Sequence, residues 1–317
     1  MNGKLSPLFP PPAGNAVNTT SRRRRGHVIG LTALFTNGPR LKRGYFDALK
    51  DDTHGLMPGA VYSELYKLAL AGKCDVIDVG VGRGATSIAF ALGIQESGRA
   101  SVVHAIDQFS QHSRGPHRYS RATNPHDCDA LNLVEFRANV DKYGVSHLVR
   151  PRLGTTDAIA PKLSPDLRAD LLSIDVDGMI DRDLAYFYDF VEPGGIIVLD
   201  DYSDSIDGPS ASRAAHIRVQ SEAEIRAWID KDRAFNARRL LGKKLLTYRL
   251  ANYFAFVGAM TFERTIGPHG TTAVFRKATD RPFSSFSLSG IPRIEQGMIE
   301  DFIADCRMAR LRLPTSA

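Results

Sequence analysis

The sequence predicts an α/β protein built on a doubly wound, mostly parallel seven-stranded sheet that ends in an antiparallel C-terminal hairpin. Two observations carry this prediction. Short, nearly continuous apolar segments alternate with segments of helical periodicity, and glycine or aspartate follows several of the apolar segments. Buried parallel strands are apolar throughout because helices cover both faces of their sheet. Right-handed crossovers bring the carboxyl ends of these strands to one edge, where ligands bind.

The individual elements follow from periodicity. A helix is predicted over residues 60–71, where Val61, Leu65 and Leu68 recur at helical spacing. A strand over 75–79 then runs through a glycine turn into a helix over 86–92. Further strands are predicted at residues 102–106, 149–153, 171–174 and 195–199, and further helices at 131–143, 183–191, 221–246 and 293–312. Residues 253–263 and 271–276 are predicted to form the closing hairpin.

Four regions are predicted along the chain. Residues 1–26 combine a proline run with Arg22 to Arg25, and we predict a disordered basic tail because so few apolar side chains cannot offset the entropy of ordering. Residues 27–58 form a lead-in or cap, 59–277 the α/β domain, and 278–317 a loop and terminal helix.

Composition limits the classes of partner. The formal charge is +6, but residues 1–46 hold eight Lys and Arg and no acid, which leaves 33 basic and 35 acidic residues in the remainder. A near-neutral body weakens the case for nucleic acid or membrane binding. The three cysteines form no CxxC pair, and no run approaches the roughly 18 apolar residues that span a bilayer. These features predict a cytoplasmic protein. They leave open whether the protein forms a homo-oligomer.

The most informative turn is Asp78-Val79-Gly80-Val81-Gly82-Arg83-Gly84. Glycines between a strand and a helix let the backbone approach a ligand and direct free amides at an anionic group. With Ala85 the string also matches the GxGxxA dinucleotide fingerprint, so an NAD(P)-dependent oxidoreductase is one alternative. Three features count against the oxidoreductase. Asp78 precedes the first glycine, the turn lies some way into the chain, and the sheet ends in an antiparallel hairpin. A second alternative is a tight turn with no ligand.

Here the sequence resembles the class I S-adenosylmethionine (SAM)-dependent methyltransferases, from Ala60 to Tyr202 and on to the hairpin ending at Arg276. The resemblance implies a Rossmann-like methyltransferase fold with SAM as cofactor. It assigns the methionine part of SAM to the acid and glycines of the turn, the ribose to the acid after the second strand, and the adenine to the loop after the third. These implied cofactor-binding residues are Asp78, Gly80, Gly82, Gly84, Asp107, Thr155 and Asp157.

Aspartates also end two later strands. Asp175 and Asp177 follow residues 171–174, and Asp200 and Asp201 follow 195–199. If these strands are neighbours the carboxylates converge, and their repulsion is costly unless a cation or protons compensate it. Oxygen ligands favour Mg²⁺, with Mn²⁺ or Ca²⁺ as alternatives. The structural alternative is that such acids cap the following helix or turn.

These segments resemble the metal-dependent small-molecule O-methyltransferases, the sugar enzymes most closely and catechol O-methyltransferase more distantly. The resemblance implies that Asp175, Asp200 and Asp201 bind Mg²⁺, and that Asp175 and Asp177 are catalytic, with Asp177 as general base. The chain departs from the sugar enzymes in continuing with Gly178-Met179-Ile180-Asp181. The implied reaction is direct transfer of the SAM methyl group to the hydroxyl of a small molecule.

A nucleic-acid methyltransferase is a further alternative, which the arginine tail would suit. The sequence has neither an Asn-Pro-Pro-Tyr-type tetrapeptide nor a Pro-Cys dipeptide, so we expect no nucleic-acid partner. A basic segment that includes Lys243 and Lys244 could contact an anionic substrate or simply form a solvated helix face.

Overall fold

The computed structural model describes residues 41, 43–109, 125–176, 178–204, 222–231, 243–268 and 270–311. Contacts divide the chain into a unit at 1–39 and a compact unit at 40–317, and all described residues lie in the second. The predicted basic tail at 1–26 lies outside the described residues. The predicted four-region division therefore stays a prediction.

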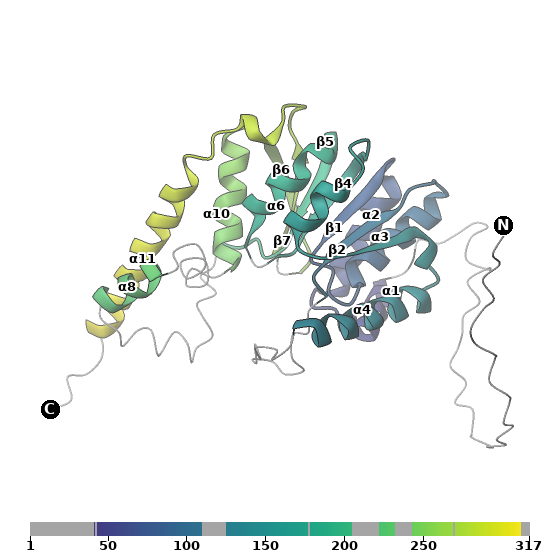
Figure 1. Ribbon diagram of the computed structural model, residues 1–317, viewed down its shortest axis with the longest axis horizontal. Helices are drawn as coiled ribbons and strands as arrows, with labels where there is room; N and C mark the ends of the chain where they lie inside the picture. The colour runs from purple at the N-terminus through teal and green to yellow at the C-terminus, as the bar shows by residue number, and fades with distance from the viewer. Residues whose placement is uncertain are drawn as a thin grey trace, which may run out of the picture. The chain divides into compact units, whose positions relative to one another are not determined.

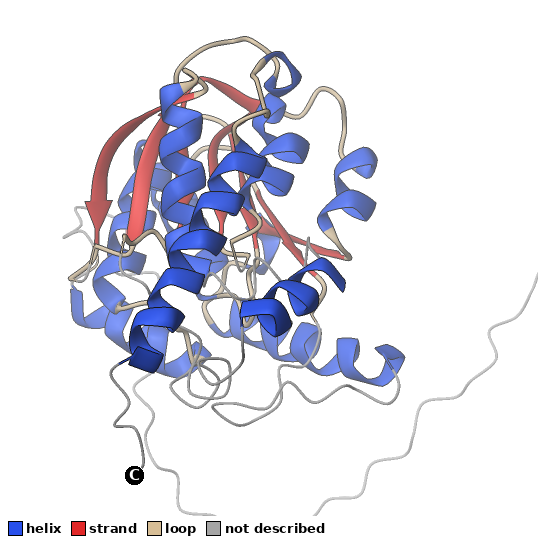
Figure 2. Ribbon diagram, turned by 90° about the vertical axis from the view of Figure 1, so that its left-hand side faces the viewer, coloured by secondary structure: helices blue, strands red, loops and turns tan. Residues whose placement is uncertain are grey.

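The sheet has seven strands in the order β3-β2-β1-β4-β5-β7-β6. The first five strands, β1 to β5, run parallel to one another. Strand β7 pairs antiparallel with both β5 and β6 (Figures 1 and 2). The strands are β1 Asp75–Val79, β2 Val103–Asp107, β3 Val149–Leu153, β4 Ala169–Ile174, β5 Val191–Leu199, β6 Met260–Ile266 and β7 Thr272–Lys277. The predicted fold class is confirmed.

Helices cover both faces of this sheet. They are α1 Arg43–Thr53, α2 Gly59–Ala71, α3 Ala85–Ser97, α4 Pro125–Lys142, α5 Thr156–Ile159, α6 Ile180–Phe187, α8 Glu222–Lys231, α10 Lys243–Phe256 and α11 Ile291–Leu311. Short 3₁₀ turns occur at Ser146–Leu148, Ala160–Lys162, Tyr188–Phe190 and Phe283–Ser285.

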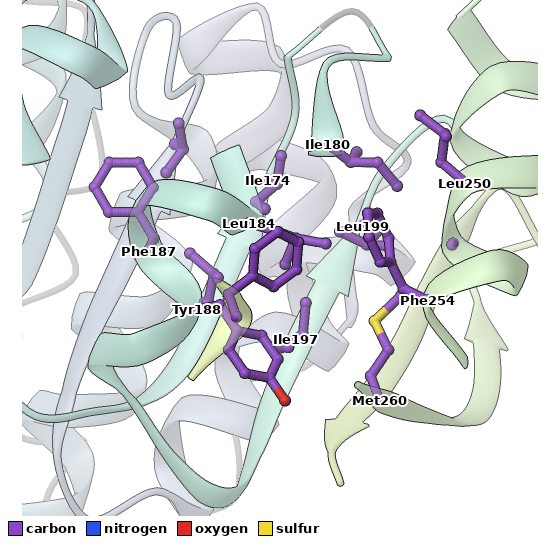
Figure 3. Packing of buried hydrophobic residues seen from close by; sticks show 14 of the residues in the cluster. Ile174, Ile180, Leu184, Phe187, Tyr188, Ile197, Leu199, Leu250, Phe254 and Met260 are labelled. Carbon is purple, nitrogen blue, oxygen red and sulfur yellow. The ribbon is translucent and has the colours of Figure 1, made fainter. Parts of the chain in front are cut away.

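Two apolar cores result, one on each face. Successive strand residues point to opposite faces, so Ile197 packs with α6, α10 and α11 while Val198 packs with α1 to α4. In the first core, Leu184 of α6 and Phe254 of α10 surround Ile197 and Leu199 (Figure 3). This double cover buries the central strands β1, β2 and β4, whereas the outer strands β3 and β6 are largely exposed.

The structure corrects several predicted boundaries. The predicted strand at 253–263 is wrong at its start, because α10 continues to Phe256 and β6 begins at Met260. Leu246, Leu250 and Phe254 are spaced i, i+4 and are all buried, so one helical face continues into the first core. Phe254 is thus a helical core residue, whereas Phe256 at the end of the helix is exposed.

Two more boundaries differ near β5. The helix predicted at 183–191 begins earlier, at Ile180, and ends in a 3₁₀ turn. Strand β5 begins at Val191 instead of residue 195, because Val191 already pairs with Ala169 before an irregularity in register. That irregularity accommodates Pro193 and two glycines, which are weak strand formers.

Among the described residues, none of the helices combines the length and the apolar character needed to cross a bilayer.

Candidate functional site at the carboxyl edge of the sheet

The glycine turn joins β1 to α3. Gly80 has φ +85° and donates its amide to the carbonyl of Ile106 at 2.9 Å. A β-carbon at Gly80 would clash with the backbone carbonyl of Asp175, so the turn lies directly against the end of β4. Gly84, with φ +96°, is the N-cap of α3 and lies against the ring of Phe136. Both positions require glycine for close approach as well as for their left-handed backbone.

Asp107 holds the middle of this turn. Its Oδ2 accepts the amide of Gly82 at 2.8 Å, and its Oδ1 accepts the amide of Phe109 at 2.7 Å. Asp107 is half-buried at the end of β2, next to β1 in the sheet. A β-carbon at Gly82 would have no atom within 4 Å, so this part of the turn is open. The carboxylate therefore orders the turn, and its contact with ribose stays a prediction.

Asp78 lies below the turn, with 1% of its surface exposed. Its Oδ2 accepts hydroxyl hydrogen bonds from Thr86 at 2.7 Å and Ser87 at 2.6 Å, both in the first turn of α3. Burial raises the pKa of Asp78 to about 6, although these hydroxyls and that of Ser173 partly offset the burial. The carboxylate ties β1 to α3, and its predicted contact with the methionine part of a cofactor remains untested.

The loop after β3 lies beside the same edge. The amide of Gly154 donates to the carbonyl of Asp107 at 3.0 Å, which holds the loop next to the end of β2. Thr155 is the N-cap of α5, and a hydrogen bond from its side chain lowers the pKa of the exposed Asp157. The predicted adenine-binding residues are thus near Asp107, and their role stays a prediction.

The acids at the ends of β4 and β5 converge as expected. Asp175, Asp200 and Asp201 each offer a carboxylate oxygen, and these three oxygens lie within 4.8 Å of one another. The two strands are neighbours, and the amide of Asp200 donates to the carbonyl of Ile174 at 3.1 Å. Asp177 lies outside the described residues, so the structure does not place the predicted general base.

Two features control the charge of this acidic cluster, defined as Asp175, Asp200 and Asp201. Burial and then the charge of Asp201 raise the pKa of Asp200, while a hydrogen bond from Thr272 Oγ1 to Asp200 Oδ1, 2.5 Å long, lowers it. Asp201 is 7% exposed, has φ +57°, and forms an ion pair in which Lys243 Nζ lies 2.6 Å from Oδ2. A non-glycine residue in this left-handed conformation stores strain, a feature that concentrates at functional sites.

Two residues beside the cluster were not identified from sequence. Lys243 was named only as part of a basic segment, and Tyr62 only falls within the helix predicted at residues 60–71. Burial raises the pKa of Tyr62, and the carboxylates of Asp175, Asp200 and Asp78 raise it further. The phenol oxygen accepts the amide of Met57 at 3.2 Å. No spacing rule connects these residues with the cluster, because separate helices bring them there.

The donor set of the cluster suits a divalent metal. Three carboxylate oxygens within a few ångströms are the ligands that Mg²⁺, Mn²⁺ or Ca²⁺ prefer, whereas zinc sites contain mainly cysteine and histidine. Metal binding would also offset the repulsion that contributes to the raised pKa of Asp200. The residues present therefore fit such an ion.

A glycine turn lies between β1 and α3, and acids end β2, β4 and β5 at the same edge of the sheet, which is the edge where doubly wound sheets bind ligands. Residues 77–202 match a family model described as a methyltransferase domain. The matched segment contains the glycine turn and the acidic cluster. The resemblance to methyltransferases is thereby confirmed over this segment.

Solved structures to which the chain is similar include O-methyltransferases. A putative O-methyltransferase from Klebsiella pneumoniae has 17% identity, with 78% of this chain and 93% of that chain covered and a TM-score of 0.43. TomG from Streptomyces achromogenes, in complex with SAM, has 15% identity, the same coverages and a TM-score of 0.44. A Bacillus cereus O-methyltransferase in complex with SAH has 13% identity, coverages of 75% and 92%, and a TM-score of 0.44. Likeness at this level assigns no function to the chain. No curated protein matches it.

Proposed function

We propose that this protein is a SAM-dependent methyltransferase that transfers a methyl group to the hydroxyl of a small molecule with the assistance of a divalent cation. The methyltransferase-domain match over residues 77–202 supports the class of reaction. The observation that carries the metal-assisted part is the convergence of Asp175, Asp200 and Asp201. The glycine turn packs directly against the backbone of Asp175. The cofactor and the acids would therefore share one edge of the sheet.

The turn would hold the cofactor through its backbone. Gly80 and Gly84 have no side chains at the points where the turn lies closest to the end of β4 and to α4. Gly82 leaves open space, and its amide is held by the carboxylate of Asp107. A carboxylate at the end of β2 suits the ribose hydroxyls of a nucleoside. Asp107, Thr155 and Asp157 would therefore surround the nucleoside part, and Asp78 would set the base of the turn.

The acidic cluster would hold Mg²⁺ and position the acceptor. When bound, a divalent cation lowers the pKa of a coordinated hydroxyl and orients it. Asp175, Asp200 and Asp201 would supply its carboxylate ligands, with Thr272 fixing the rotamer of Asp200. Asp177 is proposed as the base that accepts the hydroxyl proton, since it follows Asp175 by two residues. Proximity and alignment at one edge would then contribute to the rate enhancement.

The test uses Asp200→Ala, with the exposed Asp166→Ala as the control. Formation of S-adenosylhomocysteine is followed on a panel of catechols and hydroxylated sugars, with and without EDTA, and SAM and NADH binding are measured by calorimetry. We expect SAM binding in all three proteins, no NADH binding, and chelator-sensitive turnover that Asp200→Ala lowers by about 10² or more. Turnover that survives both EDTA and Asp200→Ala would remove the metal from the mechanism. Binding of NADH instead of SAM would favour the oxidoreductase alternative.

We further propose a cytoplasmic location and a small-molecule acceptor, with no nucleic-acid partner. The near-neutral charge outside residues 1–46 supports the absence of a nucleic-acid partner. Sedimentation of the full chain would establish whether it forms a homo-oligomer.

A further inference from the structure

Lys243 is the first residue of α10, and its ammonium contacts the acidic cluster. Nζ lies 2.6 Å from Oδ2 of Asp201, whose side chain is only 10% exposed. The backbone of Lys243 packs closely against the turn that follows β4, because a β-carbon at Gly178 would lie 3.3 Å from both the α-carbon and the carbonyl oxygen of Lys243. The packing of α10 therefore directs this lysine at one of the three proposed metal ligands.

We propose that Lys243 and a divalent cation compete for Asp201, so that the cation enters the acidic cluster by displacing the lysine ammonium. This inference rests on the proposed function in assuming that a cation binds there. The carboxylate of Asp201 is short, largely buried and attached to a left-handed backbone, so it has little freedom to turn toward a second partner. An ammonium at 2.6 Å and a divalent cation on the same group would also repel each other strongly.

The lysine is able to leave. Its side chain is 44% exposed, so the released ammonium would be solvated, whereas the aspartate would stay buried. A partly exposed ion pair contributes at most about 1 kcal/mol, which a divalent cation on three carboxylates outweighs. The pair would therefore lower the affinity for the cation without preventing binding. Until a cation binds, the lysine limits the repulsion among the three acids.

The first experiment measures the affinity of Mn²⁺ by calorimetry at fixed pH and ionic strength. Lys243→Met removes the charge and keeps the stem, Lys243→Arg keeps the charge, and Lys244→Met removes the adjacent charge as a matched control. We expect the dissociation constant to fall by up to about fivefold in Lys243→Met, equivalent to about 1 kcal/mol, and to change less than about twofold in the other two. SAM binding, measured in parallel, should be unchanged in every variant and reports correct folding.

The second experiment needs no substitution. The wild-type protein is acetylated for short times with and without saturating Mn²⁺, and peptide mass spectrometry follows Lys243, with Lys244 as internal reference. We expect Mn²⁺ to speed the acetylation of Lys243 relative to Lys244, because displacement exposes the ammonium. An unchanged or slower reaction, or an unchanged Mn²⁺ affinity in Lys243→Met, would overturn the competition while leaving the metal site intact. Absence of Mn²⁺ binding in every protein would overturn both this inference and the metal-assisted part of the proposed function.

Discussion

At the amino edge of the sheet, the ammonium of Lys277 is 2.7 Å from the carbonyl oxygen of Val191, 3.0 Å from that of Tyr188, and 4.3 Å from the centre of the Tyr188 ring. At the carboxyl edge, Asp200 and Asp201 lie side by side, and the charge of one raises the pKa of the other. The backbone thus satisfies the buried charge at the first edge, whereas the acids at the second repel each other.

A cavity and the acidic cluster lie at different edges of the sheet. A cavity of about 350 Å³ lies at the amino edge, lined by Arg168, Glu192, Lys277 and neighbouring residues. Its charged groups are largely engaged, since Arg168 pairs with Glu192 at 3.4 Å and Lys277 is bonded as above. Charges that are paired in this way can stabilise the fold, whereas converging like charges indicate where a ligand would be bound. The following substitutions test this difference.

The largest expected effect is on the glycine turn. Gly80→Ala places a methyl group against the carbonyl of Asp175 and forces a left-handed residue to carry a β-carbon. We expect the free energy of unfolding to fall by about 4 kcal/mol or more. Gly82→Ala is the control, since its β-carbon meets no atom and only its φ of +51° is unfavourable, which costs about 1 kcal/mol. Urea unfolding of both variants measures the gap, and equal losses would show that the turn can shift away from β4.

The next effect concerns pH. The folded pKa of Asp78 is raised to about 6 by burial, so the folded state binds this proton more tightly than the unfolded state. Ionisation of Asp78 therefore lowers stability as pH rises from about 4 to about 6, by up to about 3 kcal/mol, and the penalty is constant above that window.

Asp78→Asn removes this titration and keeps an oxygen that accepts from Thr86 and Ser87. The difference in unfolding free energy between wild type and variant should change steadily between pH 4 and 6 and then level off. Parallel stability profiles over that range would show that Asp78 titrates at its ordinary pKa.

At the amino edge we expect an intermediate effect. Lys277→Met leaves the carbonyls of Tyr188 and Val191 without their ammonium donor, and should lower the free energy of unfolding by about 2 kcal/mol. Arg276→Met, at the exposed neighbouring position paired with Glu263, should lose less than about 1 kcal/mol. Neither variant should alter Mn²⁺ or SAM binding in calorimetry. A change in Mn²⁺ affinity at Lys277 would mean that the two edges are electrostatically linked.

The sequence predicted the parallel part of the sheet and the convergence of the acids because both depend on local rules. An apolar run that ends in aspartate marks where a strand ends, and parallel strands end at one edge, so Asp175 and Asp200 had to be close once β4 and β5 were neighbours. The start of β5 was missed because Pro193 and Gly194 are poor strand formers, and only pairing with β4 overrides that preference.

The rest of the site depends on tertiary packing. The stretch from Tyr253 to Phe256 has the composition of a strand, and its helical conformation comes from burial of Phe254 in the core shared with Leu250. The same helix carries Lys243 to Asp201, a contact between residues far apart in the chain. Composition identified a basic segment, but only the packing of α10 against Gly178 determines which acid its first lysine meets.

The smallest expected effect has the opposite sign. Asp200→Asn removes a carboxylate whose pKa is raised by burial and by Asp201, while its amide oxygen can still accept from Thr272. Because ionisation of such a group opposes folding, the variant should gain about 1 kcal/mol at neutral pH, and the gain should vanish at low pH, where Asp200 is protonated in both states.

Urea unfolding at several pH values measures this gain, with Asp166→Asn as an exposed control that should change by less than about 0.5 kcal/mol. The same Asp200→Asn protein should bind Mn²⁺ more weakly than wild type, so that stability and cation affinity move in opposite directions. A loss of stability at neutral pH would show that Asp200 is satisfied by its protein neighbours, as Lys277 is at the amino edge, and that the acidic cluster needs no cation to offset its charge.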